Sequence, residues 1–210
     1  MIEELKALQK KISQKIRLIP LLQTPKYIAG IDVGYFSGKN LAQAVIVVMN
    51  FPEFKIIEIQ KKVSPLSFPY VPGFLAFREL PIILEAFQNL KTKPDLLIID
   101  GQGIAHPRRA GIAVHLGVEI GLPTIGCAKK PLLKLSYDLA QKRGAKFPIY
   151  FQEEIVGYVV RTQSKVKPVF VSPGHLITVD EAVEWILKTA TKFRLPEPLR
   201  LAHLFSKTRD

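Results

Sequence analysis

Cysteine is almost absent from the sequence, and so are long apolar runs. The single cysteine, Cys127, has no second cysteine with which to form a disulfide or share a zinc ion, which excludes disulfide scaffolds and zinc fingers. The longest purely aliphatic run covers residues 44–49, far too short to span a bilayer, and residues 1–5 lack the basic and apolar regions of a signal peptide. We therefore expect a cytoplasmic protein with no membrane partner.

Acidic side chains are scarce as well. Eighteen Asp and Glu stand against thirty Lys and Arg, so the formal net charge is +12. Residues 101–150 hold eight basic and two acidic side chains, which is half of this surplus in a quarter of the chain. Because a positively charged protein concentrates polyanions around itself, nucleic acid is the leading class of partner.

The rest of the composition is that of a folded protein. Of the 210 residues, 48% are hydrophobic and 23% are charged, which supplies enough apolar surface for a sizeable core and excludes a disordered or collagen-like chain. This length allows one large domain or two small ones. Because the sequence contains no interdomain linker or internal repeat, we expect a single domain over residues 1–210.

Hydrophobic periodicity predicts one helix and then three strands. Ile2, Leu5, Leu8, Ile12 and Ile16 recur at the spacing of an amphipathic helix. Three β-rich runs follow at residues 27–33, 42–49 and 54–63. The gaps between them are too short for crossover helices, so the three strands should form an antiparallel meander.

Strands and helices alternate in the remaining sequence. Residues 74–90 show a helical face that Pro81 should break or kink, and the apolar run at 95–100 is typical of a strand buried on both faces. Pro107 can begin another helix that continues to about Gly121, whereas residues 137–148 should form a surface excursion. Further strands are expected at 123–128, 155–161 and 169–172, and further helices at 178–193 and 197–207. This element order predicts a ribonuclease H-like fold, a mixed α/β sheet of antiparallel and parallel strands with flanking helices.

Two aspartates stand at the ends of apolar strands. Asp32 closes the run Tyr-Ile-Ala-Gly-Ile-Asp, and Asp100 closes Leu-Leu-Ile-Ile-Asp. If the two strands are neighbours, the carboxylates meet at one edge of the sheet and repel each other unless a cation lies between them. Such hard oxygen ligands favour Mg2+ or Mn2+, although two unrelated turn caps would give the same pattern.

Several other polar residues allow two interpretations. Glu79 lies on the opposite side of its predicted helix from Phe74 and Phe77, where most glutamates are solvent-exposed, and His175 lies in a loop where functional residues and plain turns both occur. Lys129 follows a buried strand and should point into the sheet edge, while Lys130 should be surface charge. His106, Arg108 and Arg109 could contact phosphate or be solvated in the first turn of a helix.

Several long stretches of the sequence resemble the endonuclease V family, the repair nucleases of deaminated bases. The resemblance runs from about Tyr27 to Arg200-Leu-Ala-His203. Its most specific motifs are residues 47–57, Phe68-Pro-Tyr-Val-Pro-Gly-Phe-Leu-Ala-Phe-Arg-Glu79, Ile99-Asp-Gly-Gln-Gly-Ile-Ala-His-Pro-Arg108, Pro123-Thr-Ile-Gly-Cys-Ala-Lys129 and Val171-Ser-Pro-Gly-His175. The resemblance implies Mg2+-dependent hydrolysis, with Mn2+ able to substitute, of the second phosphodiester bond on the 3′ side of deoxyinosine.

The resemblance also implies roles for individual residues. Asp32 and Asp100 would hold the metal, Glu79 would complete the acidic cluster, His175 would assist at the same site, and Lys129 would stabilise charge on the phosphate. Tyr70 would fill the space left in the duplex when the damaged base swings into a pocket near Gly73, Gly101 and Gly103. The DNA-binding set that follows is Pro69, Tyr70, Val71, Pro72, Gly73, Gly101, Gly103, His106 and Arg108.

Two features keep other interpretations open. Gly34 stands where many members of the family carry a hydroxyl residue, which puts a minor hydrogen bond near the metal in doubt. The alternative for Tyr70, which the sequence favours less than the wedge role, is a core tyrosine beneath a proline-rich loop. The partner predicted first is DNA containing deaminated bases, bound by a monomer. The alternatives are an endoribonuclease that cuts inosine-containing RNA and a basic nucleic-acid-binding module whose acids are structural.

Overall fold

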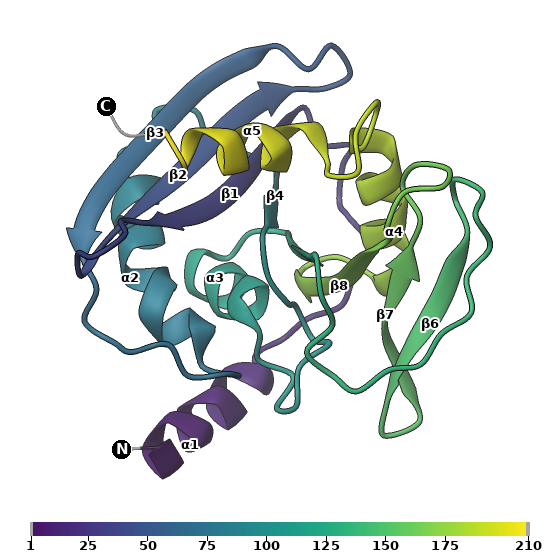
Figure 1. Ribbon diagram of the computed structural model, residues 1–210, viewed down its shortest axis with the longest axis horizontal. Coiled ribbons are helices and arrows are strands. Elements are labelled where there is room, and N and C mark those ends of the chain that lie inside the picture. The colour runs from purple at the N-terminus through teal and green to yellow at the C-terminus, as the bar shows by residue number, and fades with distance from the viewer. Residues whose placement is uncertain (1, 209–210) are drawn as a thin grey trace.

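The protein is built around one mixed β-sheet (Figure 1). The computed structural model describes residues 2–208, and within them eight strands lie in the order β3-β2-β1-β4-β5-β8-β7-β6. The strands are β1 (Tyr27–Tyr35), β2 (Leu41–Asn50), β3 (Ile56–Pro65), β4 (Leu96–Ile99), β5 (Thr124–Ala128), β6 (Lys146–Phe151), β7 (Glu154–Val160) and β8 (Val169–His175). The helices are α1 (Ile2–Ser13), α2 (Leu75–Gln88), α3 (Ile112–Ile120), α4 (Val179–Thr189) and α5 (Glu197–Phe205).

The pairing of the strands confirms the predicted mixed sheet. β1, β2 and β3 form the antiparallel meander, and β1 pairs in parallel with β4, which in turn pairs in parallel with β5. The remaining pairs, β5 with β8, β8 with β7 and β7 with β6, are antiparallel. The carboxyl ends of the three parallel strands β1, β4 and β5 therefore meet at one edge.

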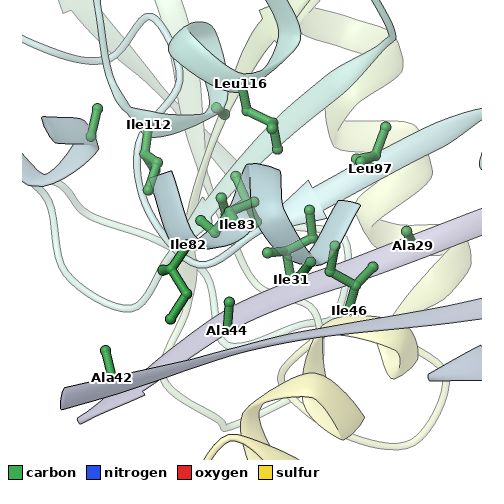
Figure 2. Packing of buried hydrophobic residues seen from close by; sticks show 14 of the residues in the cluster. Ala29, Ile31, Ala42, Ala44, Ile46, Ile82, Ile83, Leu97, Ile112 and Leu116 are labelled. Atoms are coloured by element: carbon green, nitrogen blue, oxygen red, sulfur yellow. The ribbon is translucent and has the colours of Figure 1, made fainter. Parts of the chain in front are cut away.

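Helices bury both faces of the sheet. Figure 2 shows Ile31, Ile46 and Leu97 packed against Ile83 of α2 and Leu116 of α3 on one face. On the other face, a second core contains residues of α4 and α5, and α5 lies across β1 and β2. Successive residues of β4 alternate between the two cores, which explains why this strand is apolar throughout.

Two helices differ from the sequence prediction. α2 continues through Pro81, so of the two predicted alternatives, a break or a kink, the break is wrong; Pro81 is exposed, while Ile82 and Ile83 are buried in the core. α3 begins at Ile112 and not at Pro107. Arg109 has a φ of 53°, a left-handed conformation that a helix cannot contain, so residues 107–111 form a loop.

One strand was missed by the sequence prediction. β6 begins at Lys146, inside residues 137–148 that were expected to form a surface excursion, continues to Phe151 and contains Pro148. A proline cannot donate a hydrogen bond within a sheet, but β6 is an edge strand, where one missing donor is tolerated. Among residues 2–208, no helix combines the length and the apolar character that crossing a bilayer requires.

Candidate active site

Asp32 and Asp100 lie next to each other at the carboxyl edge of the parallel strands. Ile31 of β1 pairs with Ile99 of β4, and the amide of Asp100 donates to the carbonyl of Ile31 at 3.1 Å. β1 itself continues to Tyr35, so Asp32 lies within the strand and is only 8% exposed. The pairing confirms that the two strands are neighbours, as the carboxylate pair requires.

Lys129 and His203 complete a polar cluster with these aspartates. Lys129 follows β5 and places Nζ 2.6 Å from Asp100 Oδ2. His203, on α5, places Nδ1 3.0 Å from Asp32 Oδ2 and 3.3 Å from Lys129 Nζ. Asp32, Asp100 and His203 each offer one ligand atom, and these atoms lie within 4.8 Å of one another. One edge of the sheet thus gathers two acids, an imidazole and an ammonium group.

Glu79 approaches the aspartates from α2. Its side chain is 6% exposed, so the interpretation of Glu79 as a solvent-exposed acid is wrong: it shares the inward face of α2 with Ala76 and Ile83. Burial is the main reason that the pKa of Glu79 is raised to about 8. The hydrogen bond from Tyr35 opposes this shift, and the negative charges of Asp32 and Asp100 add to it.

The three carboxylates share one pattern of hydrogen bonding. Each has a partner at one oxygen, and among residues 2–208 no hydrogen bond reaches the other oxygen. The partners are His203 and Ser206 at Asp32 Oδ2, Lys129 at Asp100 Oδ2, and Tyr35 at Glu79 Oε1. Buried acids that repel one another and keep an oxygen free are suited to binding a hard cation.

A cavity of about 290 Å³ is lined in part by residues that follow members of this cluster in the sequence. Gly101 directly follows Asp100 and lines the cavity, as do Gly73 and His106. Lys130, expected to be surface charge, lines it too and is exposed. Gly103 does not, because it packs against β8, where an added Cβ would lie 2.1 Å from the carbonyl of Pro173. The wall of the cavity therefore contains two of the three glycines that were predicted to surround a flipped base.

Tyr70 stands at the rim of the cavity. It is 68% exposed, which rules out the core tyrosine that the sequence left open. Val71 also lines the cavity, while Pro69 and Pro72 are exposed beside it. The loop thus presents an aromatic ring to solvent at the mouth of the cavity.

His106 and Arg108 have partners inside the protein. His106 Nδ1 accepts from the amide of Arg108 at 3.1 Å, so Nε2 carries the proton and donates to the carbonyl of Gly73 at 3.0 Å. Burial lowers the pKa of His106 to about 4, with the charge of Arg108 adding to the effect, so the ring is neutral at pH 7. Arg109 is paired with Glu154 at 2.5 Å. His106 and Arg108 therefore hold the loop at Gly73 in place through hydrogen bonds. Their contact with phosphate stays a prediction.

His175 is not brought together with the carboxylates. It pairs with Thr124 at the first residue of β5, whereas Lys129 follows the last residue, so the length of β5, about 13 Å, separates the two edges. Its Nδ1 accepts from the amide of Arg17 at 3.3 Å, and burial lowers its pKa. The expectation that His175 assists at the acidic site is corrected by this placement, because β8 is antiparallel to β5 and ends at the opposite edge.

The histidine that does lie at the cluster was missed. His203 ends the motif Arg200-Leu-Ala-His203, which the sequence marked only as the limit of a resemblance. The sequence signal that could have identified His203 as a site residue was its position in that motif, on the last predicted helix.

Comparison with known proteins gives one consistent result. A model described as Endonuclease V matches residues 10–204 of the chain. A protein named Endonuclease V from Dictyoglomus thermophilum is 53% identical over 205 residues, which is 98% of this chain and 89% of that protein. One from Trichormus variabilis is 42% identical over 209 residues, 99% of this chain and 95% of that protein.

Solved structures agree with the sequence comparisons. The crystal structure of the Endonuclease V from Streptomyces avermitilis superposes with a TM-score of 0.92 at 40% identity, covering 99% of this chain and 92% of that one. Endonuclease V from Ciona intestinalis, solved in complex with a 24mer DNA containing an inosine followed by a ribo-adenosine, gives a TM-score of 0.85 at 31% identity, covering 98% and 96%.

Proposed function

Because this chain belongs to the endonuclease V family, we propose that it is a DNA repair endonuclease that recognises deaminated bases, chiefly deoxyinosine. It hydrolyses the second phosphodiester bond 3′ to the lesion. The observation that carries the proposal is the cluster of Asp32, Asp100, Lys129 and His203 at the sheet edge, together with a cavity whose lining includes Gly101, the residue after Asp100.

Asp32, Asp100 and Glu79 would hold Mg2+ in this proposal, and Mn2+ would substitute. The residues fit such an ion because all three are oxygen donors and each keeps one carboxylate oxygen without a hydrogen bond among the described residues. An ion held by these residues would supply Lewis-acid chemistry, namely activation of water and stabilisation of charge on a phosphate.

The residues around the carboxylates orient the reaction. Tyr35 and Ser206 hold Glu79 and Asp32 through hydroxyl groups, so the free oxygens have fixed positions. Lys129 lies beside Asp100, where its ammonium group would stabilise negative charge on the phosphate. His203 lies between Asp32 and Lys129 and would take the assisting role that the sequence assigned to His175.

The cavity and Tyr70 would supply lesion recognition. Enzymes that act at a base in a duplex swing it out of the stack, and this costs less for a weakly paired base. A cavity of about 290 Å³, with Gly73 and Gly101 among its lining residues, would receive the extruded base. Tyr70, exposed at the rim, would stack in the space that the base vacates.

A cleavage assay with matched substrates tests the function. Labelled duplexes that carry one deoxyinosine, one inosine in RNA, or no lesion are incubated with Mg2+ or with chelator, and the cut is mapped to the nucleotide. We expect Mg2+-dependent cutting of the deoxyinosine strand, one nucleotide beyond the lesion. Preferential cutting of RNA would identify an endoribonuclease, and binding without any cutting would identify a non-catalytic module.

A further inference from the structure

The carbonyl of Gly73 is a meeting point for three side chains. Gln9 Nε2 donates to it at 2.9 Å, Arg108 NH2 at 2.8 Å and His106 Nε2 at 3.0 Å. Gly73 itself has a φ of 80°, a left-handed conformation that favours glycine. Three donors from two distant segments thus fix the orientation of a single peptide group.

Gln9 is the member of this group that comes from α1. Within α1 it is the buried residue, at 0% exposure. Its Nε2 also reaches the carbonyl of Ala110 at 3.4 Å, and its Oε1 accepts from Arg108 Nε. Both ends of the amide are used, so the burial of this polar side chain is compensated only in one arrangement of the loop.

The anchored peptide forms part of the recognition site. Gly73, Val71 and Tyr70 line the same cavity, and the amide of Phe74 donates to the carbonyl of Val71 at 2.9 Å to close the turn. The guanidinium of Arg108 lies over the ring of Phe74, 4.5 Å from its centroid. Rotation of the Gly73 peptide would therefore move the wall of the cavity together with the loop that carries Tyr70.

We infer that Gln9 is a positioning residue for lesion recognition, acting from α1 through the Gly73 carbonyl on the loop that carries Tyr70. The inference rests on the proposed role of Tyr70 and the cavity. Gln9 lies outside residues 10–204, the stretch that the family model matches, and far from the carboxylates in sequence. If Gln9 were only a structural anchor, substituting it would lower the stability of the fold and leave the selectivity for the lesion unchanged.

Two substitutions separate these roles. Gln9→Met keeps the length and shape of the side chain and removes every hydrogen bond of the amide. Gln9→Glu keeps the acceptor for Arg108 and removes the donors to Gly73 and Ala110, so it serves if Gln9→Met does not fold. The matched control is Gln14→Met, an exposed glutamine just after the same helix.

The ratio of affinities for a deoxyinosine duplex and an undamaged duplex is measured in chelator, with the thermal midpoint on the same samples. We expect Gln9→Met to lower this ratio roughly tenfold, the loss that weakened stacking of one ring predicts. Cleavage of a single-stranded deoxyinosine substrate should fall less than cleavage of the duplex, since the base still enters the cavity but no base pair is opened there. Gln14→Met should change neither quantity.

A double-mutant cycle with Tyr70→Ala completes the test. If Gln9 acts through the loop, Gln9→Met costs less selectivity once Tyr70 is removed than it does in the wild type. Three outcomes would overturn the inference: an unchanged affinity ratio in Gln9→Met, an additive loss of selectivity in the double mutant, or equal slowing of single-stranded and duplex cleavage. A wild-type protein that prefers the lesion but never cuts would contradict the proposed nuclease and leave the binding test of Gln9 intact. A wild-type protein without lesion preference would refute both.

Discussion

At the scale of single residues, the acidic site balances burial against charge. Burial raises the pKa of Glu79 to about 8 and raises that of Asp100, where the ammonium group of Lys129 works in the opposite direction. Ser206 and His203 both reach the same oxygen of Asp32. The positive and hydrogen-bonding groups stabilise part of the negative charge, and the remaining repulsion makes the cluster a ready binding site for a cation.

His203, which lies at the cluster, and His175, which the sequence predicted there, should behave differently when mutated. His203→Ala should lower the cleavage rate by roughly a hundredfold or more, the range for loss of a group that takes part in proton transfer or in orienting the site. His175→Asn should leave the rate close to that of the wild type, because His175 lies at the far edge of the sheet. Single-turnover rates on a deoxyinosine duplex measure both, and the reverse order would contradict the assignment of His203.

His115 gives a pH dependence of stability that is separate from catalysis. It is 4% exposed, its Nε2 has no hydrogen-bond partner among the described residues, and burial lowers its pKa to about 4. In the unfolded chain the pKa is about 6.5. Between these values the unfolded state binds more protons, so the stability contribution is present above pH 6.5 and is lost as the pH falls towards 4.

Urea denaturation of wild type and His115→Met at pH 7 and pH 5 measures this effect. We expect the free energy of unfolding of the wild type to fall by about 2 kcal/mol more than that of His115→Met between the two pH values. His106 is present in both proteins and cancels in the comparison. Equal losses in the two proteins would show that the ring of His115 is not buried in its neutral form.

The sequence predicted the carboxylates of the site better than their partners. Asp32 and Asp100 were visible because each interrupts an apolar strand, a local pattern that a single sequence displays. Burial of Glu79 and the approach of His203 depend on how α2 and α5 pack on the sheet, and neither packing has a local signal. His175 was misplaced because a strand-to-helix loop looks the same whether it lies at one edge of the sheet or the other.

At the scale of elements, the loop before α2 lies at the mouth of the cavity. Residues 69–73 carry two prolines that fix φ and restrict the residues before them, so Tyr70 is held at little entropic cost. Its ring is exposed and lines the mouth of the cavity. This arrangement is suited to stacking into a duplex.

Tyr70→Ala should therefore change selectivity and leave stability almost unchanged. We expect the affinity ratio of a deoxyinosine duplex to an undamaged one to fall about tenfold, given stacking worth roughly 1 to 3 kcal/mol per base. The thermal midpoint should stay near the wild-type value, as it should in the control Tyr150→Ala, an exposed tyrosine on β6. A lower midpoint with an unchanged ratio would reject the wedge role.

The elements that the sequence predicted are those with a strong local pattern. The meander was found because three β-rich runs are joined by short gaps, and β4 because an apolar run marks a strand covered on both faces. β6 was missed because Pro148 hides an edge strand, and the start of α3 was misplaced because Pro107 begins a loop closed by tertiary hydrogen bonds, such as that from the amide of Gly111 to the carbonyl of Gly103 at 3.1 Å.

At the scale of the whole molecule, the charge predicts how binding responds to salt. A protein with a formal net charge of +12 that neutralises phosphates releases counterions when it binds. If it contacts about six phosphates, affinity for duplex DNA should fall roughly a thousandfold between 50 and 200 mM salt. Fluorescence anisotropy across this range measures the slope, and a loss of less than tenfold would show that the positive charge is not directed at the DNA backbone.

The most direct test of the account is cleavage by Asp32→Asn and Asp100→Asn of a labelled duplex that bears one deoxyinosine, in Mg2+. The control is Asp95→Asn. Asp95 precedes β4, at the end of the strand opposite to Asp100, and its carboxylate accepts from the amides of Lys26 and Tyr27. We predict no detectable cleavage by either site variant. Binding of the lesion duplex in chelator should be retained or stronger, because negative charge facing the phosphates is removed. The control should cut at close to the wild-type rate. Cleavage near that rate by Asp32→Asn or Asp100→Asn would contradict the claim that these two carboxylates form the metal site of a nuclease.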